Sequence, residues 1–168
     1  SITIWEGEEL GLPQVDVPFE QLQDPEAIAN WPHTLSRDGA RTPMPWASGE
    51  PQLGFSTAEP WLPVGESHHA LAVDRQEASG GSMLHFTREC LRLRNARSAL
   101  RQGGMTVTHA DDCVLVFERA EAGERLRCTF NLSDRPARFQ ASGKPLIGTG
   151  HIDGGMLGPY AAVVEEIA

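Results

Sequence analysis

The chain has 168 residues, 40% of them hydrophobic, which is enough for one or two domains with a core of modest size. Its net charge of −9 argues against a nucleic-acid partner, because phosphate binding needs clustered lysine and arginine side chains. No apolar run approaches the length of a membrane span, and residues 1–5 lack the basic start of a signal peptide. We therefore expect neither nucleic acid nor a membrane among its partners.

The first half of the chain is poor in regular patterns. It opens on the apolar run Ile2-Thr3-Ile4-Trp5, which is typical of a strand. Nine of the twelve prolines lie between Pro13 and Pro63, and residues 12–81 show no sustained helical or strand period. We interpret most of this stretch as one long loop, and a loop of such length in a compact domain is usually functional.

Two helices are predicted. The first is short and covers residues 25–29, with Asp24 as its N-cap and Pro25 in the first helical position. The second covers residues 82–95 and has Ser82 as a candidate N-cap. The apolar residues that share one face of this second helix are Met83, Phe86, Cys90 and Leu93, flanked by Leu84 and Leu91.

From residue 105 onward the pattern changes to short runs rich in β-forming residues, separated by turns. Leu126, Cys128 and Phe130 alternate with polar residues, as expected for a sheet with one solvated face. The turn residues Ala122-Gly123-Glu124 indicate a hairpin, and Asp153-Gly154-Gly155 indicates a further turn. The predicted strands are 105–108, 113–119, 125–131, 136–139, 144–147 and 161–167. Together they suggest an antiparallel β-sandwich.

The three cysteines, Cys90, Cys113 and Cys128, are too few and too scattered for a disulfide framework. We expect reduced thiols and a cytoplasmic protein. The histidines show no ligand spacing with cysteines or carboxylates, and no loop has the regular oxygen pattern of a calcium site. We therefore predict no metal and no cofactor.

The most informative segment runs from Arg37 to Trp46, with the sequence RDGARTPMPW. Pro43 and Pro45 each remove a backbone donor and fix φ, so the segment is neither a helix interior nor a central strand. It is interpreted as a rigid, ordered loop that presents arginines and an aromatic ring. Ordered loops on a scaffold commonly carry recognition residues.

This segment resembles the R-D-x-x-R-T-P-M-x-W motif of α-glucosidases in the oligo-1,6-glucosidase branch of the α-amylase superfamily, glycoside hydrolase family 13. Further matches to the family are Gly7-Glu8-Glu9-Leu10-Gly11, Asn30-Trp31-Pro32 and Gly54-Phe55-Ser56. The resemblance is specific over residues 1 to about 100 and weaker over the last 70.

The resemblance implies an α+β fragment. Residues 1–102 would be the end of a catalytic (β/α)8 barrel, with its eighth strand, a long active-site loop and its last helix. Residues 103–168 would form a C-terminal antiparallel β-sandwich domain. A single βα unit has no partners for its strand edges, so we expect the N-terminal barrel portion to be its main partner.

The resemblance also implies which residues are absent. The family's catalytic carboxylates follow the fourth and fifth barrel strands, and a third aspartate follows the seventh in an Asn-His-Asp motif. No such triplet occurs in this sequence. We therefore expect no catalytic residue in this chain, which should be inactive alone.

The role that the resemblance leaves for this chain is substrate recognition. In the resembling enzymes an arginine of the R-T-P-M motif holds hydroxyls of the terminal glucose, and Arg41 is the best match, followed by Arg37. Glu8 lies just past the expected barrel strand and is a third candidate. The alternative for the arginines is that they only brace the loop. For Glu8 the alternative is that it belongs to a solvated pair or is a partner of the arginines. Trp31, Trp46 and Trp61 either stack on sugars or pack the loop.

The resemblance implies part of a retaining α-glucosidase that acts on α-glucosides or short malto- and isomalto-oligosaccharides. Two alternatives stay open. One is a glucosyltransferase of the same superfamily, trehalose-forming or sucrose-using. The other is a stand-alone β-domain that serves as a binding or interaction module. Linkage preference, α-1,4 or α-1,6, is not encoded in the motifs present.

Overall fold

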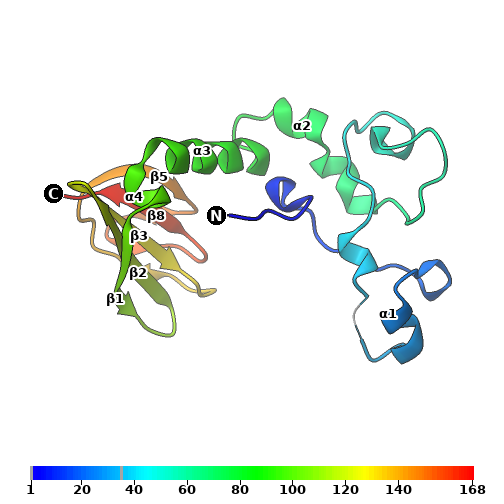
Figure 1. Cartoon of the computed structure of the whole chain (residues 1–168), viewed down its shortest axis with the longest axis horizontal. Coiled ribbons are helices and arrows are strands. Elements are labelled where there is room, and N and C mark those ends of the chain that lie inside the picture. Colours follow the sequence, from blue (N-terminus) through cyan, green and yellow to red (C-terminus); the bar gives the residue numbers. More distant parts are fainter. Residues whose placement is uncertain (1, 35) are drawn as a thin grey trace. The chain divides into compact units, whose positions relative to one another are not determined.

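The computed structural model describes residues 2–34 and 36–168, and the chain divides into two compact units, Ser1–Arg88 and Glu89–Ala168 (Figure 1). Helices and loops make up the described part of the first unit, and antiparallel sheets dominate the second. This mixed organisation agrees with the α+β class expected from the sequence. The described helices include none with the length and apolar character that crossing a membrane requires.

The first unit is built from short helical segments. Its α-helices are α1 (Pro25–Asn30), α2 (Val73–Glu77) and the start of α3 (Met83–Ala96). Its 3-10 helices are η1 (Glu8–Leu10), η2 (Phe19–Gln21), η3 (Asp38–Ala40), η4 (Pro51–Gly54) and η5 (Glu66–Leu71). The predicted helix at 25–29 is confirmed, and Asp24 caps it, since its Oδ1 accepts from Glu26 N at 3.2 Å.

The strand predicted at residues 2–5 does not form among the described residues of this unit. Ile2, Ile4 and Trp5 are exposed there, and no described strand of the unit pairs with them. The physical reason is that a strand gains its hydrogen bonds only from a neighbouring strand, so an unpaired apolar run stays irregular.

The long loop is packed rather than loose. One cluster of buried residues contains Val17, Leu22, Ala27 and Leu62, and a second contains Leu10, Met44 and Leu84. Each cluster joins residues that are far apart in the sequence, such as Val17 and Leu62, so no local period reveals it. The segment from Leu12 to Gly81 is therefore held by apolar contacts, some of them with Leu10 and Leu84 outside it.

The predicted helix at 82–95 is confirmed as α3. Ser82 Oγ accepts from His85 N at 3.4 Å, which supports its expected capping role. The predicted apolar face is only half-buried, with Met83 exposed, while Leu84 is the buried residue. The reason is that Leu84 packs against Leu10 and Met44. The helical period of α3 does not predict these two contacts, because both partners lie outside the helix.

The second unit holds two antiparallel sheets and the short helix α4 (Ser98–Arg101). The larger sheet has the strand order β1 (Gly104–Ala110), β2 (Val114–Glu121), β3 (Glu124–Asn131), β8 (Ala162–Glu166) and β5 (Lys144–Thr149). The smaller has the order β4 (Ala137–Arg138), β7 (Met156–Leu157) and β6 (Ile152–Asp153). The strands predicted from residue 105 onward and both predicted turns are found, and Figure 1 labels the strands of the larger sheet.

One face of the larger sheet differs from the prediction. Leu126 and Cys128 are buried as expected, but Thr129 and Asn131, on the face expected to be solvated, are also buried. Strands β4 and β7 supply residues to the cavity that Thr129 lines, so the smaller sheet shields this face. The alternation of apolar and polar residues predicts one solvated face because it describes a single sheet. Here two sheets share a core, so the second face is buried as well.

The start of α4 packs on the opposite face of the larger sheet. Glu124 Oε2 accepts from Ser98 Oγ at 3.0 Å and from Ala99 N at 2.8 Å, and Arg97 bridges Glu124 and Glu166. Glu124 shares a face of β3 with Leu126, and Glu166 pairs with Leu126, so both glutamates are on the face opposite to Thr129. Charged and backbone groups therefore anchor α4 to the sheet.

Candidate functional site

The Arg37–Trp46 segment is an ordered loop, as predicted. Thr42, Met44 and Pro45 are buried, whereas Trp46 is 52% exposed. The backbone is fixed from both sides, because Trp46 N donates to Leu53 O at 2.8 Å and Pro45 O accepts from Val73 N at 2.9 Å. The loop is therefore a rigid base for the side chains that it exposes.

Arg37 is engaged with a buried carboxylate. Its backbone N donates to Asp24 Oδ2 at 3.1 Å and its Nε donates to the same oxygen at 2.8 Å, while NH2 binds Oδ1. The hydrogen bonds from Arg37 hold the pKa of Asp24 well below its usual range, and Asp24 raises the pKa of Arg37. This matches the bracing role that the sequence left open for Arg37.

Asp38 is a buried residue that sequence reasoning missed. It is 1% exposed, and its Oδ2 accepts from the backbone N of Gln23 at 2.7 Å and of Asp24 at 2.8 Å. Its place in the motif beside Arg37 is the only sequence signal that points to it. Asp24 and Asp38 together tie the start of α1 to the arginine loop.

Arg41 differs from Arg37. Its backbone N donates to Asp38 O at 2.9 Å, which closes the turn η3. The residue is exposed, and its side chain forms no hydrogen bond or ion pair within residues 2–34 and 36–168. Arg41 therefore presents an unused guanidinium from a fixed backbone.

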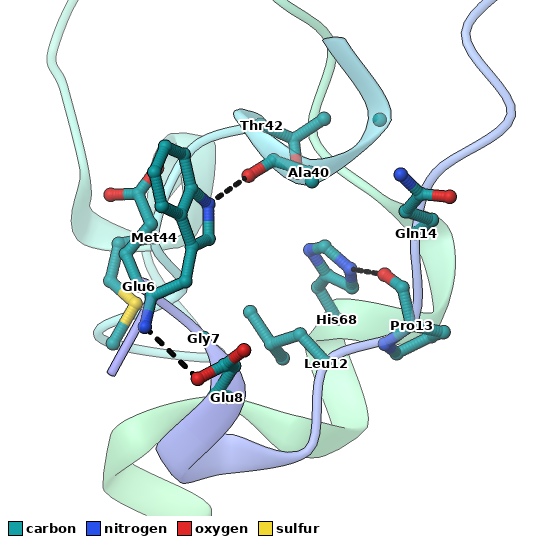
Figure 2. Close-up of a pocket in the computed structure, with 12 residues that line it drawn as sticks. Glu6, Gly7, Glu8, Leu12, Pro13, Gln14, Ala40, Thr42, Met44 and His68 are labelled. Carbon is teal, nitrogen blue, oxygen red and sulfur yellow. Dashed lines mark hydrogen bonds between the residues drawn. The ribbon is translucent and has the colours of Figure 1, made fainter. Parts of the chain in front are cut away.

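Glu8 lies in η1 and lines a small pocket of the first unit (Figure 2). Its Oε2 accepts from Trp5 N at 3.0 Å, and the Trp5 indole Nε1 donates to Ala40 O at 2.8 Å. His68, 1% exposed, lines the same pocket and pairs through Nε2 with Pro13 O at 3.0 Å. Trp5 thus links the Glu8 turn to the arginine loop.

The three candidate residues are not gathered in one pocket. Of the described residues that line the pocket in Figure 2, Glu8 is the only one of the three, and neither Arg37 nor Arg41 is among them. The pocket encloses about 150 Å³, which is smaller than ordinary ligand pockets. This pocket alone is therefore too small to be a complete binding site.

The tryptophans also separate into different environments. Trp31 is 45% exposed and lies 5.6 Å from the ring centroid of Phe19, which fits a packing role. Trp61 is 67% exposed and Trp46 lines an open groove with Phe55. Stacking on a sugar by these two residues stays a prediction.

The described residues hold no group of three or more histidine, cysteine or acidic side chains placed to bind a metal ion. The cysteines are unpaired in the structure, with Cys128 buried and Cys90 and Cys113 half-buried. Burial raises the pKa of Cys128 to about 11 and also raises the pKa of Cys90.

Comparison with known proteins identifies the family to which the chain is similar. Residues 1–103 match the family described as alpha amylase, catalytic domain, and residues 101–164 match a domain of unknown function, DUF3459. A probable alpha-glucosidase of Rhizobium meliloti (strain 1021) is 41% identical over 90% of this chain and 28% of its own length. A probable oligo-1,6-glucosidase of Bacillus subtilis (strain 168) is 28% identical over 85% of this chain and 29% of its own.

The chain is also similar to solved structures. The alpha-glucosyl transfer enzyme XgtA is 39% identical, with a TM-score of 0.85 over 97% of this chain and 32% of the other. The trehalulose synthase MutB of Pseudomonas mesoacidophila MX-45 has a TM-score of 0.84 at 21% identity, which shows a shared fold alone. The chain spans about a third or less of these proteins. With its first 103 residues matched to the catalytic-domain model, the chain belongs to the alpha-amylase family.

Proposed function

We propose that this chain is the C-terminal part of a retaining α-glucosidase that releases terminal α-linked glucose from short oligosaccharides. The observation that carries the proposal is the 41% identity to a probable alpha-glucosidase over 90% of the chain. Its substrates would be α-glucosides and short malto- or isomalto-oligosaccharides.

In this proposal residues 1–102 complete a (β/α)8 barrel, and residues 103–168 form a C-terminal β-sandwich domain. The two family matches, at 1–103 and 101–164, support this division. The exposed apolar run at 2–5 is then the barrel's eighth strand, which pairs once the N-terminal portion is present. That portion is the partner we propose, and the three unpaired thiols support a cytoplasmic location.

The chain itself would supply no catalytic group. Retaining glycosidases need two carboxyl groups about 5 Å apart that are free to act on the sugar. Asp24 and Asp38 are buried and already bind Arg37 and backbone N–H groups. The 168-residue chain should therefore show no turnover of p-nitrophenyl α-glucoside. Turnover by the chain alone would contradict the proposal, and an isolated chain that is a folded monomer by circular dichroism and gel filtration would favour a stand-alone module.

Substrate recognition would fall first to Arg41. A planar guanidinium serves a carboxylate and neighbouring hydroxyls at once, and Arg41 presents one from a backbone that η3 fixes. Arg37 is the second candidate through the donors that Asp24 leaves unused, and Glu8 is the third.

The test is the variant Arg41→Ala in the full-length enzyme. Loss of a hydrogen bond from a charged group costs about 1.5–3 kcal/mol, so kcat/KM should fall about 10- to 100-fold. Arg92→Ala, which removes an exposed arginine on α3, is the matched control and should leave kcat/KM unchanged. An unchanged kcat/KM for Arg41→Ala would remove Arg41 from the site.

A glucosyltransferase of the same superfamily is the second candidate, favoured by the 39% identity to the alpha-glucosyl transfer enzyme XgtA. Product analysis with maltose and an alcohol acceptor separates the two. Free glucose as the main product supports hydrolysis, and a glucosylated acceptor as the main product supports transfer.

A further inference from the structure

The second unit contains an open cavity of about 900 Å³, within the size range of small-molecule sites. Strands β2 and β3 of the larger sheet form one wall, and β4 and β7 of the smaller sheet supply another. The cavity lies entirely within Glu89–Ala168 and uses no residue of the Arg37–Trp46 loop.

Three arginines line the cavity in a chain whose net charge is −9. Arg127 donates to Ser142 Oγ, and Arg135 NH2 contacts Cys113 Sγ at 3.4 Å. The side chain of Arg138 forms no hydrogen bond or ion pair with the part of the chain that the structure describes. Most of the guanidinium donors at the cavity therefore remain available.

Two acidic residues, Asp111 in the cavity lining and Glu165 behind it, offset part of this charge. Asp111 Oδ1 accepts from Cys113 N at 2.8 Å and Val114 N at 2.7 Å, and its Oδ2 pairs with His109 at 2.9 Å. Glu165 is opposite Arg127 in the strand register and offsets that arginine, but it is fully buried and does not line the cavity. Three arginines against two carboxylates thus leave the surroundings of the cavity with a net positive charge.

Thr129 provides an independent sign of a ligand. It is 3% exposed, it lines the cavity, and its Oγ1 is buried with no hydrogen-bond partner among residues 2–34 and 36–168. Arg127 Nε is buried and unpartnered in the same way. Nearly all buried polar groups in proteins have partners, so these atoms are expected to bind something that enters the cavity.

The same walls also carry apolar side chains. Val114, Val116 and Ala137 form a buried cluster there, and the half-buried Phe139 and Met156 also line the cavity. Such a surface accommodates the carbon skeleton of a ligand, whereas guanidinium groups recognise the oxygens of a phosphate. A free inorganic anion would leave these apolar side chains unused.

We propose that this cavity binds a small phosphate ester. Arg135 and Arg138 bind the phosphate, Thr129 donates its hydroxyl to a ligand oxygen, and the organic group lies on the apolar side chains near Phe139. Helix α4 does not cover the site, because Glu124 and Glu166 anchor that helix to the opposite face of the sheet. It is independent of the proposed glucosidase activity.

Calorimetry on the full-length enzyme tests this with phenyl phosphate as the probe, against inorganic phosphate and benzyl alcohol at 0.15 M salt. Phenyl phosphate should bind at least tenfold more tightly than either. Arg138→Gln and Arg135→Gln should each weaken binding about tenfold. Thr129→Val should weaken it about threefold, and Thr129→Ser should restore it. Arg101→Gln, an exposed arginine of α4, is the matched control and should bind as the unchanged protein does.

Each other outcome overturns a part of the proposal. Equal affinity for inorganic phosphate overturns the ester, and equal affinity for benzyl alcohol overturns the phosphate site. No binding, or unchanged affinity in Arg138→Gln and Arg135→Gln, overturns the site itself. Melting temperatures of all variants show whether lost binding comes from lost folding, and the Ser variant of Thr129 preserves the test if the Val variant unfolds.

Discussion

Arg37 holds the buried carboxylate of Asp24 through two side-chain donors, Nε at 2.8 Å from Oδ2 and NH2 on Oδ1. The same carboxylate caps α1 by accepting from Glu26 N. One acidic group therefore joins the start of a helix to the loop that carries the family's arginine motif.

The variant Arg37→Ala should lower the melting temperature at pH 7, because it leaves a buried carboxylate without its main partner. The pKa of Asp24 is lowered in the folded state, so this contribution is present above its unfolded pKa of about 4 and is lost as the pH falls below that. The difference in melting temperature between the variant and the unchanged protein should therefore shrink between pH 5 and pH 3.

Arg92→Ala, an exposed arginine of α3, is the control and should show no such pH dependence. A difference that stays constant from pH 7 to pH 3 would mean that Arg37 acts through packing and not through the Asp24 charge.

Gly39 lies between the two arginines of the motif, where its backbone touches Val15. A Cβ at this position would lie 2.3 Å from Val15 O, and Gly39 O accepts from Val15 N at 3.0 Å. Gly39→Ala should cost about 1–3 kcal/mol, because the two backbone segments must separate. Gly49→Ala is the control, since no atom lies within 4 Å of its added Cβ. Urea denaturation of both variants measures the difference, and equal stabilities would show that the loop gives way without cost.

The sequence predicted what depends on local pattern. The Asp24-capped helix, α3 and the β2–β3 hairpin are all encoded within a few neighbouring residues, through capping, period and turn residues. The ordered loop from Arg37 to Trp46 was likewise predictable from its two prolines.

The remaining features depend on contacts between distant residues. The burial of Leu84 requires Leu10 and Met44, and the burial of Thr129 requires a second sheet. The exposed run at 2–5 fails to form a strand because pairing needs a neighbour that no local pattern supplies. Arg37 pairs with Asp24, which is thirteen residues away in the sequence. No local pattern predicts this contact either.

Gln76 is a buried polar residue that joins three segments. Its Nε2 donates to Leu10 O at 2.8 Å and Leu71 O at 2.9 Å, and its Oε1 accepts from Leu84 N at 2.9 Å at the start of α3. Gln76→Met keeps the length of the side chain but leaves buried backbone groups unpaired, so we expect a loss of about 1–3 kcal/mol in the free energy of unfolding. Gln21→Met, an exposed position on η2, should change it by less than about 0.5 kcal/mol. Similar losses in both variants would mean that the Gln76 hydrogen bonds contribute nothing specific.

Cys128 should be the least reactive thiol of the native protein. It is 3% exposed, and burial raises its pKa to about 11, so very little thiolate is present at pH 8. A thiol reagent at pH 8 should label Cys113 and spare Cys128 until the protein is denatured, which peptide mass spectrometry resolves. Because the folded pKa exceeds the unfolded value of about 9, folding keeps this proton and stability is lost as the pH rises from 9 towards 11. Cys128→Ala should remove that part of the alkaline loss, and rapid labelling of Cys128 in the native protein would show that the sheet opens readily.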